Sequence, residues 1–314
     1  MEQRGPVVVT GGTGLVGQRL VRRLRGEGRP VRLVTRRQAL LEASAGVERV
    51  TWDGLQLDPA ALAAAEALVH LAGEPIFGGL PSAARRRQMW RSRVDSTHSL
   101  VRAIGQLPRS ERPTALVCAS AVGIYGDAGE APLSEEGPLG EGFLAELCKA
   151  WEGEARAVAP LGVRPVLLRM GLVLAREGGA LAALSALTRL GLAGRVGSGR
   201  QWVPWVHAED VIGLILHALG DAAMEGPVNA VSPGIVRNRE LVATLARVLH
   251  RPSWLPVPAF ALRWVLGPLA GELLDSRRVL PVRARQRGYA FRFAALEPTL
   301  ATELSRPPST AGPS

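Results

Sequence analysis

The sequence predicts an α/β protein with a doubly wound parallel sheet and a smaller C-terminal lobe on the substrate side. Short β-branched or apolar runs alternate with Ala- and Leu-rich stretches of helical spacing, which is typical of a parallel sheet covered by helices on both faces. The 314 residues, 47% of them apolar, suffice for one large core and an appended lobe. No run reaches the roughly 18 apolar residues that a membrane-spanning helix needs.

The first thirty-odd residues form a strand, a tight turn, a helix and a second strand. Residues 7–10 and 31–34 are the strands, and residues 18–25 carry apolar side chains at helical spacing. Further strands are expected at residues 47–52, 67–71, 115–119 and 165–168, and apolar stretches resume at 208–219 and 238–250 after Gly- and Pro-rich loops. We therefore expect a Rossmann-type domain over residues 1–235, whose loop 176–204 contributes to a substrate groove, a lobe over 236–302 and a disordered tail over 303–314.

The charge of the chain is strongly positive, at +10, but its distribution does not favour nucleic-acid binding. Lysine occurs once among 38 basic residues, the arginines are dispersed, and aromatic stacking partners make up only 4% of the chain. Cys118 and Cys148 have neither disulfide nor metal-ligand spacing, so we expect two core thiols and no metal site. Because the N-terminus shows no signal-peptide pattern, we expect a cytoplasmic protein without a membrane segment.

A glycine-rich turn separates the first strand from the first helix. Gly11 allows the tight turn, Gly14 lets backbone amides approach a pyrophosphate, and Gly17 lets the helix lie close to the sheet. The N-terminal end of the helix then faces the anion with its positive dipole. Since the motif lies in its predicted structural context, it predicts a dinucleotide site.

The end of the second strand bears on the choice of nucleotide. An NAD-binding protein usually places Asp or Glu there, whereas this chain has Thr35, Arg36 and Arg37. Arginine suits a 2′-phosphate through charge-assisted hydrogen bonds. We therefore expect NADP(H) rather than NAD(H), the alternative being that Arg36 is a solvated side chain in an arginine-rich protein.

Beyond the glycine turn, several segments resemble the extended short-chain dehydrogenase/reductase superfamily. His70-Leu71-Ala72-Gly73-Glu74 is similar to the loop that lines the adenine-ribose side, Asp53 to an adenine-contacting acid, and Arg93 stands where the superfamily has a structural asparagine. The resemblance also implies that the loop 169–173, with Val173, meets the nicotinamide end. The expected cofactor-binding residues are Gly11, Thr13, Gly14, Leu15, Val16, Gly17, Thr35, Arg36, Arg37, Asp53, Leu71, Ala72, Gly73, Glu74, Arg93 and Val173.

The more specific resemblance is to an atypical subgroup, the epimerase family proteins, whose reaction is unsettled and whose C-terminal segment is a domain of unknown function. It covers the chain to about residue 300. The segments that carry it are 120–126 (SAVGIYG), 143–152, 197–210 with GSGRQ and WVH, and 226–233 (GPVNAVSP). The fold of the sugar-nucleotide epimerases and dehydratases is thereby implied.

The catalytic pair of the superfamily, Tyr-x-x-x-Lys, is missing from this chain. The residues four positions after Tyr125 and Tyr289 are Gly129 and Phe293. The position of the superfamily's serine falls on Ala121, with Ser120 one residue earlier. If chemistry occurs, the proton donor is another group, of which Tyr125 is the first candidate, and a hydrogen-bonded packing role is the alternative for it. The other candidates are His207, for which a structural role is favoured, Glu146 and Cys148.

Lys149 is the chain's only lysine, and it takes the place of the superfamily lysine if Ala145 replaces the tyrosine. An ammonium can bridge two ribose hydroxyls in a way that a guanidinium cannot. A register shifted by one residue puts Leu144 and Cys148 in those places and leaves Lys149 on the surface. The spacing does not decide between the two registers, so the candidate catalytic set is Tyr125, Lys149 and Ser120.

Two functions are consistent with these features. The first is an NADP(H)-dependent oxidoreductase or epimerase that acts on an unknown small polar substrate, with Arg200 and Gln201 in a loop over the groove. The second is a catalytically inactive NADP(H)-binding sensor or partner-binding module, and nucleic-acid binding ranks far behind both. A homodimer is compatible with the resemblance, although no feature of the sequence establishes an apolar interface.

Overall fold

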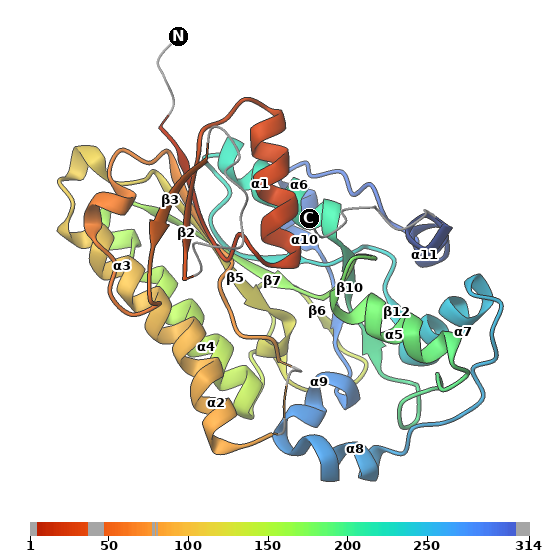
Figure 1. Ribbon diagram of the computed structural model, residues 1–314. Helices are drawn as coiled ribbons and strands as arrows, with labels where there is room; N and C mark the ends of the chain where they lie inside the picture. The colour runs from red at the N-terminus through yellow and green to blue at the C-terminus, as the bar shows by residue number, and fades with distance from the viewer. Residues whose placement is uncertain (1–4, 37–46, 77–78, 80, 306–314) are drawn as a thin grey trace.

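A computed structural model describes residues 5–36, 47–76, 79 and 81–305. Its centre is a seven-stranded parallel sheet with the strand order β11-β7-β5-β4-β1-β2-β3 (Figure 1). The order reverses beside β1, which pairs with β2 on one side and β4 on the other, as in a doubly wound fold. The strands are β1 (Val7–Thr10), β2 (Val31–Thr35), β3 (Val47–Thr51), β4 (Ala67–His70), β5 (Ala115–Ala121), β7 (Arg164–Met170) and β11 (Gly226–Ala230).

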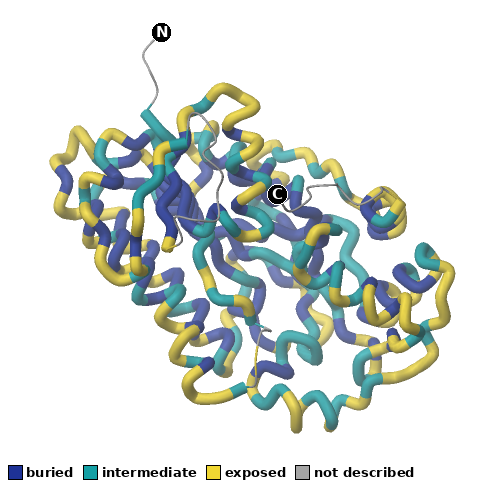
Figure 2. The backbone as a smooth tube through the Cα atoms, in the orientation of Figure 1, coloured by how far each residue is buried: buried dark blue, intermediate teal, exposed yellow. Residues whose placement is uncertain are grey.

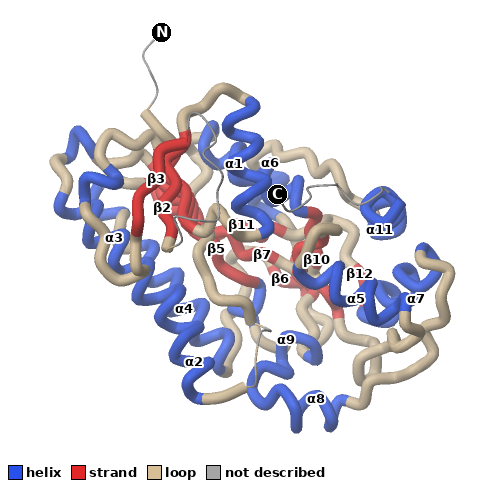
Figure 3. Tube along the Cα trace, viewed as in Figure 1, coloured by secondary structure: helices blue, strands red, loops and turns tan. Residues whose placement is uncertain are grey.

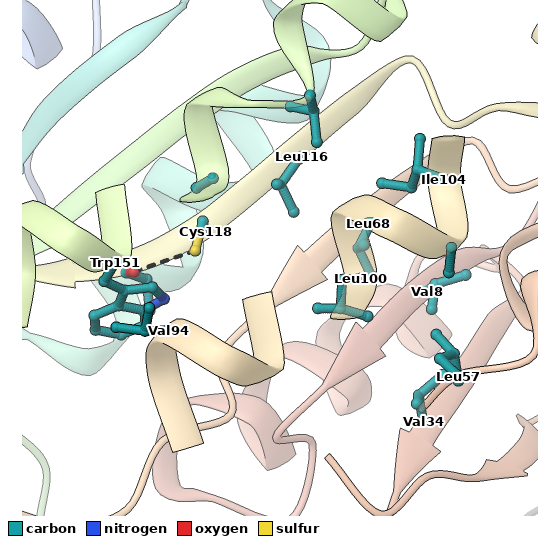
Figure 4. Packing of buried hydrophobic residues seen from close by; sticks show 14 of the residues in the cluster. Val8, Val34, Leu57, Leu68, Val94, Leu100, Ile104, Leu116, Cys118 and Trp151 are labelled. Atoms are coloured by element: carbon teal, nitrogen blue, oxygen red, sulfur yellow. Dashed lines mark hydrogen bonds between the residues drawn. The ribbon is translucent and has the colours of Figure 1, made fainter. Parts of the chain in front are cut away.

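Helices cover both faces of the sheet, because successive strand side chains point to opposite sides (Figure 3). Val7 and Val9 pack with α1 (Leu15–Gly26), α6 (Ala208–Gly220) and α10 (Val282–Gln286). Val8 belongs to the other core, with α2 (Ala83–Trp90), α3 (Ser96–Gln106) and α4 (Phe143–Arg156). Figure 4 shows Leu100 and Ile104 of α3 in this second core. Most of the sheet is buried, whereas the edge strand β3 and the outer helix surfaces are partly or fully exposed (Figure 2).

The C-terminal lobe joins the sheet domain through short strand pairs. β12 (Val236–Arg237) pairs with β9 (Trp202–Val203), and β13 (Arg278–Val279) with β6 (Pro132–Leu133). Within the sheet domain, a further short pair joins β10 (Trp205–His207) to β8 (Leu172–Leu174). The remaining helices are α5 (Gly179–Arg189), α7 (Asn238–Val248), α8 (Ala259–Leu266), α9 (Gly271–Leu274) and α11 (Leu296–Ser305). The 3₁₀ turns are η1 (Pro59–Leu62), η3 (Arg109–Glu111), η4 (Val122–Tyr125), η5 (Ala159–Leu161) and η6 (Gly267–Ala270), while η2 (Arg91–Asp95) is a π-helical turn.

The expected α/β fold class is confirmed, two local predictions are corrected, and one strand was not predicted. The segment 176–204 is not simply a loop, since it contains α5. The last strand of the sheet, β11, was not predicted because Pro227 interrupts its pattern, yet an edge strand tolerates proline. Residues 303–305 are not part of a disordered tail, because they complete α11 and Glu303 is buried against His207. Residues 306–314 lie outside the described part, and the domain boundaries stay a prediction.

Both cysteines are buried and free, as expected for core thiols. Within the described residues no helix is long and apolar enough to cross a membrane. In the same part of the chain, no group of three or more His, Cys, Asp or Glu side chains is placed to hold a metal ion.

Candidate functional site

A cavity of about 830 Å³ opens at the carboxyl ends of β1, β2, β3 and β4. Ligands of doubly wound folds bind at this edge, beside the point where the strand order reverses. The loops after β1, β2, β3 and β4, together with α2 after the last of these loops, form its walls. The lining residues are Gly11, Thr13, Gly14, Val34, Thr35, Arg36, Trp52, Asp53, Gly54, Leu55, Leu71, Ala72, Gly73, Glu74, Pro75, Ala84, Arg87, Gln88, Arg91, Ser92 and Ser96.

The glycine turn after β1 is too tight for larger residues. Gly11 has a φ of +70°, and a Cβ on it would lie 2.5 Å from the carbonyl carbon of Leu71. A Cβ on Gly17 would lie 2.2 Å from the carbonyl oxygen of Gly11. Gly14 is the N-cap of α1 and has no side-chain cap, and the first turn carries no acidic residue. The uncapped, electropositive end of α1 therefore fits a diphosphate.

The end of β2 lies at the rim of the cavity. Arg36 is exposed and lines the cavity together with Thr35, while Arg37 lies outside the described residues. Asp53 accepts hydrogen bonds from the backbone N–H groups of Gln56 (2.9 Å) and Leu55 (2.8 Å), which lower the pKa of its carboxyl group. Asp53 therefore both lines the cavity and holds the loop that follows β3.

One wall of the cavity was not predicted from the sequence. The wall is formed by α2 and η2, which line the cavity with Ala84, Arg87, Gln88 and Arg91. The run Arg85-Arg86-Arg87 comes directly after the β4 loop, and this position is the sequence signal that could have indicated the wall. Arg87 and Arg91 add positive charge to a cavity whose predicted ligand is anionic.

The loop after β4 is held by two arginines. Glu74 lines the cavity, and its carboxylate accepts a hydrogen bond of 2.8 Å from Arg85. Arg93, half-buried in η2, lies against Gly73 and over the ring of Trp151, at 5.3 Å from the ring centre. Of the other predicted cofactor contacts, Leu15, Val16 and Gly17 lie on the first turn of α1 and Val173 on β8, and none of them lines the cavity.

A buried polar cluster, which we call the sheet network, lies between β5, β7 and α4. Its centre is the pair between Arg169 and Glu152, with two hydrogen bonds of 2.8 and 2.9 Å and both side chains at most 4% exposed. Ser120 donates to Glu152 (2.8 Å), and Arg169 donates to the hydroxyl of Tyr125 (2.8 Å). The Tyr125 hydroxyl donates to Oδ1 of Asn229 at 2.7 Å.

The sheet network gives the side chains of Tyr125 and Ser120 structural partners. Both hydroxyl groups are bonded inside the protein, and neither residue lines the cavity. Burial raises the pKa of Tyr125, with Arg169 opposing it. These hydrogen bonds favour the packing role that was the alternative for Tyr125.

The structure also separates the two registers of α4. Lys149 lies at the surface and pairs with Glu146 (2.8 Å), whereas Cys148 is buried beside Leu133 and Val231. Burial raises the pKa of Cys148 to about 12, which keeps it a neutral thiol. The geometry favours the register in which Leu144 and Cys148 take the places of the superfamily's Tyr and Lys. In the structure, the side chains of Tyr125, Lys149 and Ser120 do not share one site.

Two other groups considered from the sequence have structural partners. His207 accepts a hydrogen bond from the backbone N–H of Glu209 (3.2 Å) and lies 3.1 Å from the carboxylate of Glu303. The amide nitrogen of Gln201 donates to the carbonyl groups of Val196 (3.0 Å) and Leu273 (3.1 Å). His207 therefore joins α11 to the sheet domain, and Gln201 holds α9.

Comparison with known proteins places this fold and cavity in a family. The model of the NAD dependent epimerase/dehydratase family matches residues 7–230, and that of a domain of unknown function, DUF1731, matches residues 257–303. The chain belongs to the NAD dependent epimerase/dehydratase family. Within it, the chain is similar to the epimerase family proteins of the SDR39U1 type, as its sequence features implied.

Three relatives show the extent of this similarity. The chloroplastic SDR39U1 homolog of Arabidopsis thaliana is 38% identical over 95% of this chain and 86% of its own, and YfhF of Bacillus subtilis is 34% identical over 93% and 95%. The crystal structure of human SDR39U1 with NADPH has a TM-score of 0.85 and 32% identity, covering 96% of this chain and all of the human one. Since one relative is named chloroplastic, the expected cytoplasmic location stays a prediction.

Proposed function

We propose that this chain is an NADP(H)-binding oxidoreductase or epimerase that acts on a small polar substrate. The observation that carries the proposal is the cavity in which the glycine turn and Arg36 lie at successive strand ends. A diphosphate held at the N-terminus of α1 directs the adenosine half of the nucleotide toward β2 and β3, where Arg36 is available for a 2′-phosphate. The NADPH in the human relative supports this choice of nucleotide.

The residues that would hold the nucleotide are those of the cavity. Gly11, Thr13 and Gly14 would bind the diphosphate through the backbone, and Arg36 would pair with the 2′-phosphate. When bound, the nucleotide would supply hydride transfer to or from a substrate carbon. The protein would contribute orientation and the exclusion of water from the cleft.

The test compares NADPH with NADH by calorimetry on the purified chain. The wild type is expected to bind NADPH more tightly, and Arg36→Ala should weaken NADPH binding by about tenfold, a loss of ~1.4 kcal/mol, with little effect on NADH. Arg22→Ala is the matched control, since Arg22 is exposed on α1 away from the cavity. If Arg36→Ala weakened the binding of NADPH and NADH equally, Arg36 would not recognise the 2′-phosphate.

A catalytically inactive binding module is the second candidate, and one observation favours it. Tyr125, Ser120 and Lys149 are each engaged outside the cavity. Oxidation of NADPH in the presence of a panel of aldehydes, ketones and sugar nucleotides separates the two functions. A homodimer is proposed on the resemblance alone, and light scattering tests it.

A further inference from the structure

The short helix α9 of the C-terminal lobe brings a carboxylate to the loop that follows β5. A Cβ placed on Gly123 would have two nearest neighbours, Cβ of Leu144 at 3.7 Å and Oε2 of Glu272 at 3.8 Å. Glu272 lies in α9, and Leu144 in the first turn of α4. Segments far apart in the sequence therefore meet at this point, because α9, the loop after β5 and the first turn of α4 lie close together.

Arg277 and Gln201 fix the position of α9. The guanidinium of Arg277 is buried and donates to the carbonyl of Gly126 (3.0 Å) in the β5 loop and to Asp275 (2.7 Å). Gln201 donates to the carbonyl of Leu273, the residue after Glu272. The lobe is thus hydrogen-bonded directly to the loop after β5, which Glu272 approaches. These bonds fix the backbone of α9 and thereby the position of the Glu272 carboxylate.

The carboxylate of Glu272 itself is incompletely paired. Its contact with Arg277 is 3.5 Å, longer than a well-formed hydrogen bond, and its side chain is 22% exposed. The charged and titratable groups that face it are Arg277 and Asp275 of its own lobe, Arg93 of η2 and Cys148 of α4. Burial raises the pKa of Glu272, with Arg277 opposing this effect, so the protonated acid is favoured more than in an ordinary glutamate.

Glu272 lies beside the loop at the carboxyl end of β5, the strand next to β4 in the sheet, and outside the cavity described above. A dinucleotide whose diphosphate is at α1 and whose adenosine lies over β2 and β3 extends its other half across the switch point toward β4 and β5. Gly123 follows β5 directly. Resting on the proposed function, we propose that Glu272 is the proton donor and acceptor of this protein, in place of the missing tyrosine, for a substrate with a carbonyl or secondary hydroxyl group.

The step balances with one proton and one hydride. A carbonyl substrate that receives a hydride from the reduced nicotinamide at its carbon loses its C=O π bond, and its oxygen needs a proton. The O–H bond of the Glu272 carboxyl group breaks as the new O–H bond forms on the substrate. The resulting carboxylate regains a proton from water through its exposed edge, and in the opposite direction it accepts the proton of the hydroxyl group.

The test follows the titration of Glu272 by ¹³C NMR of the full chain labelled at the glutamate carboxyl carbons. Glu272→Gln assigns the resonance by removing it, and Glu272→Asp serves the same purpose if the Gln variant does not fold. The oxidised nicotinamide ring carries a positive charge that the reduced ring lacks. If the ring lies beside Glu272, the titration midpoint should be about one pH unit lower with NADP⁺ than with NADPH.

Calorimetry on the same samples distinguishes a failure of the proposed function from a failure of the assignment of Glu272. If neither nucleotide binds, the proposed function fails. If both bind and the Glu272 midpoint is the same in the two complexes, the assignment of Glu272 is overturned while the proposed function stands. With any carbonyl substrate found in the panel, Glu272→Gln should lower kcat by about 10²- to 10⁴-fold, as expected for loss of a general acid. Glu297→Gln, a surface change on α11, should leave kcat unaltered.

Discussion

The sheet network and the site around Glu272 both contain a carboxylate and an arginine in the protein interior, but they satisfy these charges differently. Glu152 receives two hydrogen bonds from Arg169 and one from Ser120, and it is 4% exposed. Glu272 has one contact of 3.5 Å and is 22% exposed. A fully paired carboxylate has no free lone pair for a substrate, so the first site builds structure, whereas the second retains the capacity for proton transfer.

The largest effect should come from breaking the sheet network. Glu152→Gln keeps the shape of the side chain but leaves the buried Arg169 without its counter-charge, and the free energy of unfolding should fall by about 3 kcal/mol or more. Chemical denaturation measures this loss. Glu146→Gln on the exposed face of the same helix should cost less than ~0.5 kcal/mol, and a similarly small loss for Glu152→Gln would contradict the structural role.

A smaller effect is expected at the glycine turn, which serves the cleft. In Gly17→Ala the new methyl group would lie 2.2 Å from the Gly11 carbonyl oxygen, so the helix must move away from the turn. We expect a stability loss of about 1–3 kcal/mol and weaker NADPH binding. Gly26→Ala, with nothing within 4 Å of its Cβ, should leave NADPH binding unchanged, and equal NADPH affinity in both variants would argue against the anion site at α1.

The pH dependence of stability sharpens the contrast between the two carboxylates. Because the pKa of Glu272 is raised in the folded state, its contribution to stability is present below the ordinary glutamate pKa and is lost as the pH rises through the folded value. Glu272→Gln has no such loss, so its Tm relative to the wild type should increase from acid to neutral pH. A Tm difference that does not depend on pH would contradict the raised pKa.

The smallest effect is expected for Lys149. Its ion pair with Glu146 lies at the surface, so Lys149→Met should change stability by less than about 0.5 kcal/mol and leave NADPH affinity unaltered. Fluorescence titration with NADPH checks the affinity. A tenfold loss would restore the alternative register, in which this lysine holds the ribose.

The adenosine end of the cleft could be predicted from the sequence, because each of its parts is a short local segment directly after a strand. The glycine turn, Arg36 and the loop after β4 are examples. The far end could not be predicted, since Gly123, Arg277 and Glu272 come together only through packing of the C-terminal lobe. α9 has four residues, too few for any periodicity to indicate its place.

The roles of Ser120 and Tyr125 show the limit of matching motifs. Ser120 is one position away from the superfamily serine, and the alternation of side chains along β5 turns it toward Glu152. For Tyr125, the sequence offered both a catalytic and a packing role. The choice depends on Arg169 and Asn229, which come from two other strands, so only the folded arrangement decides it.

A crystal structure of the chain with NADPH tests the central claim most directly. The account predicts the diphosphate at the N-terminus of α1, the 2′-phosphate beside Arg36, and the nicotinamide ring beside Gly123 within reach of Glu272. A nucleotide bound elsewhere, or a nicotinamide ring directed away from α9, would contradict it.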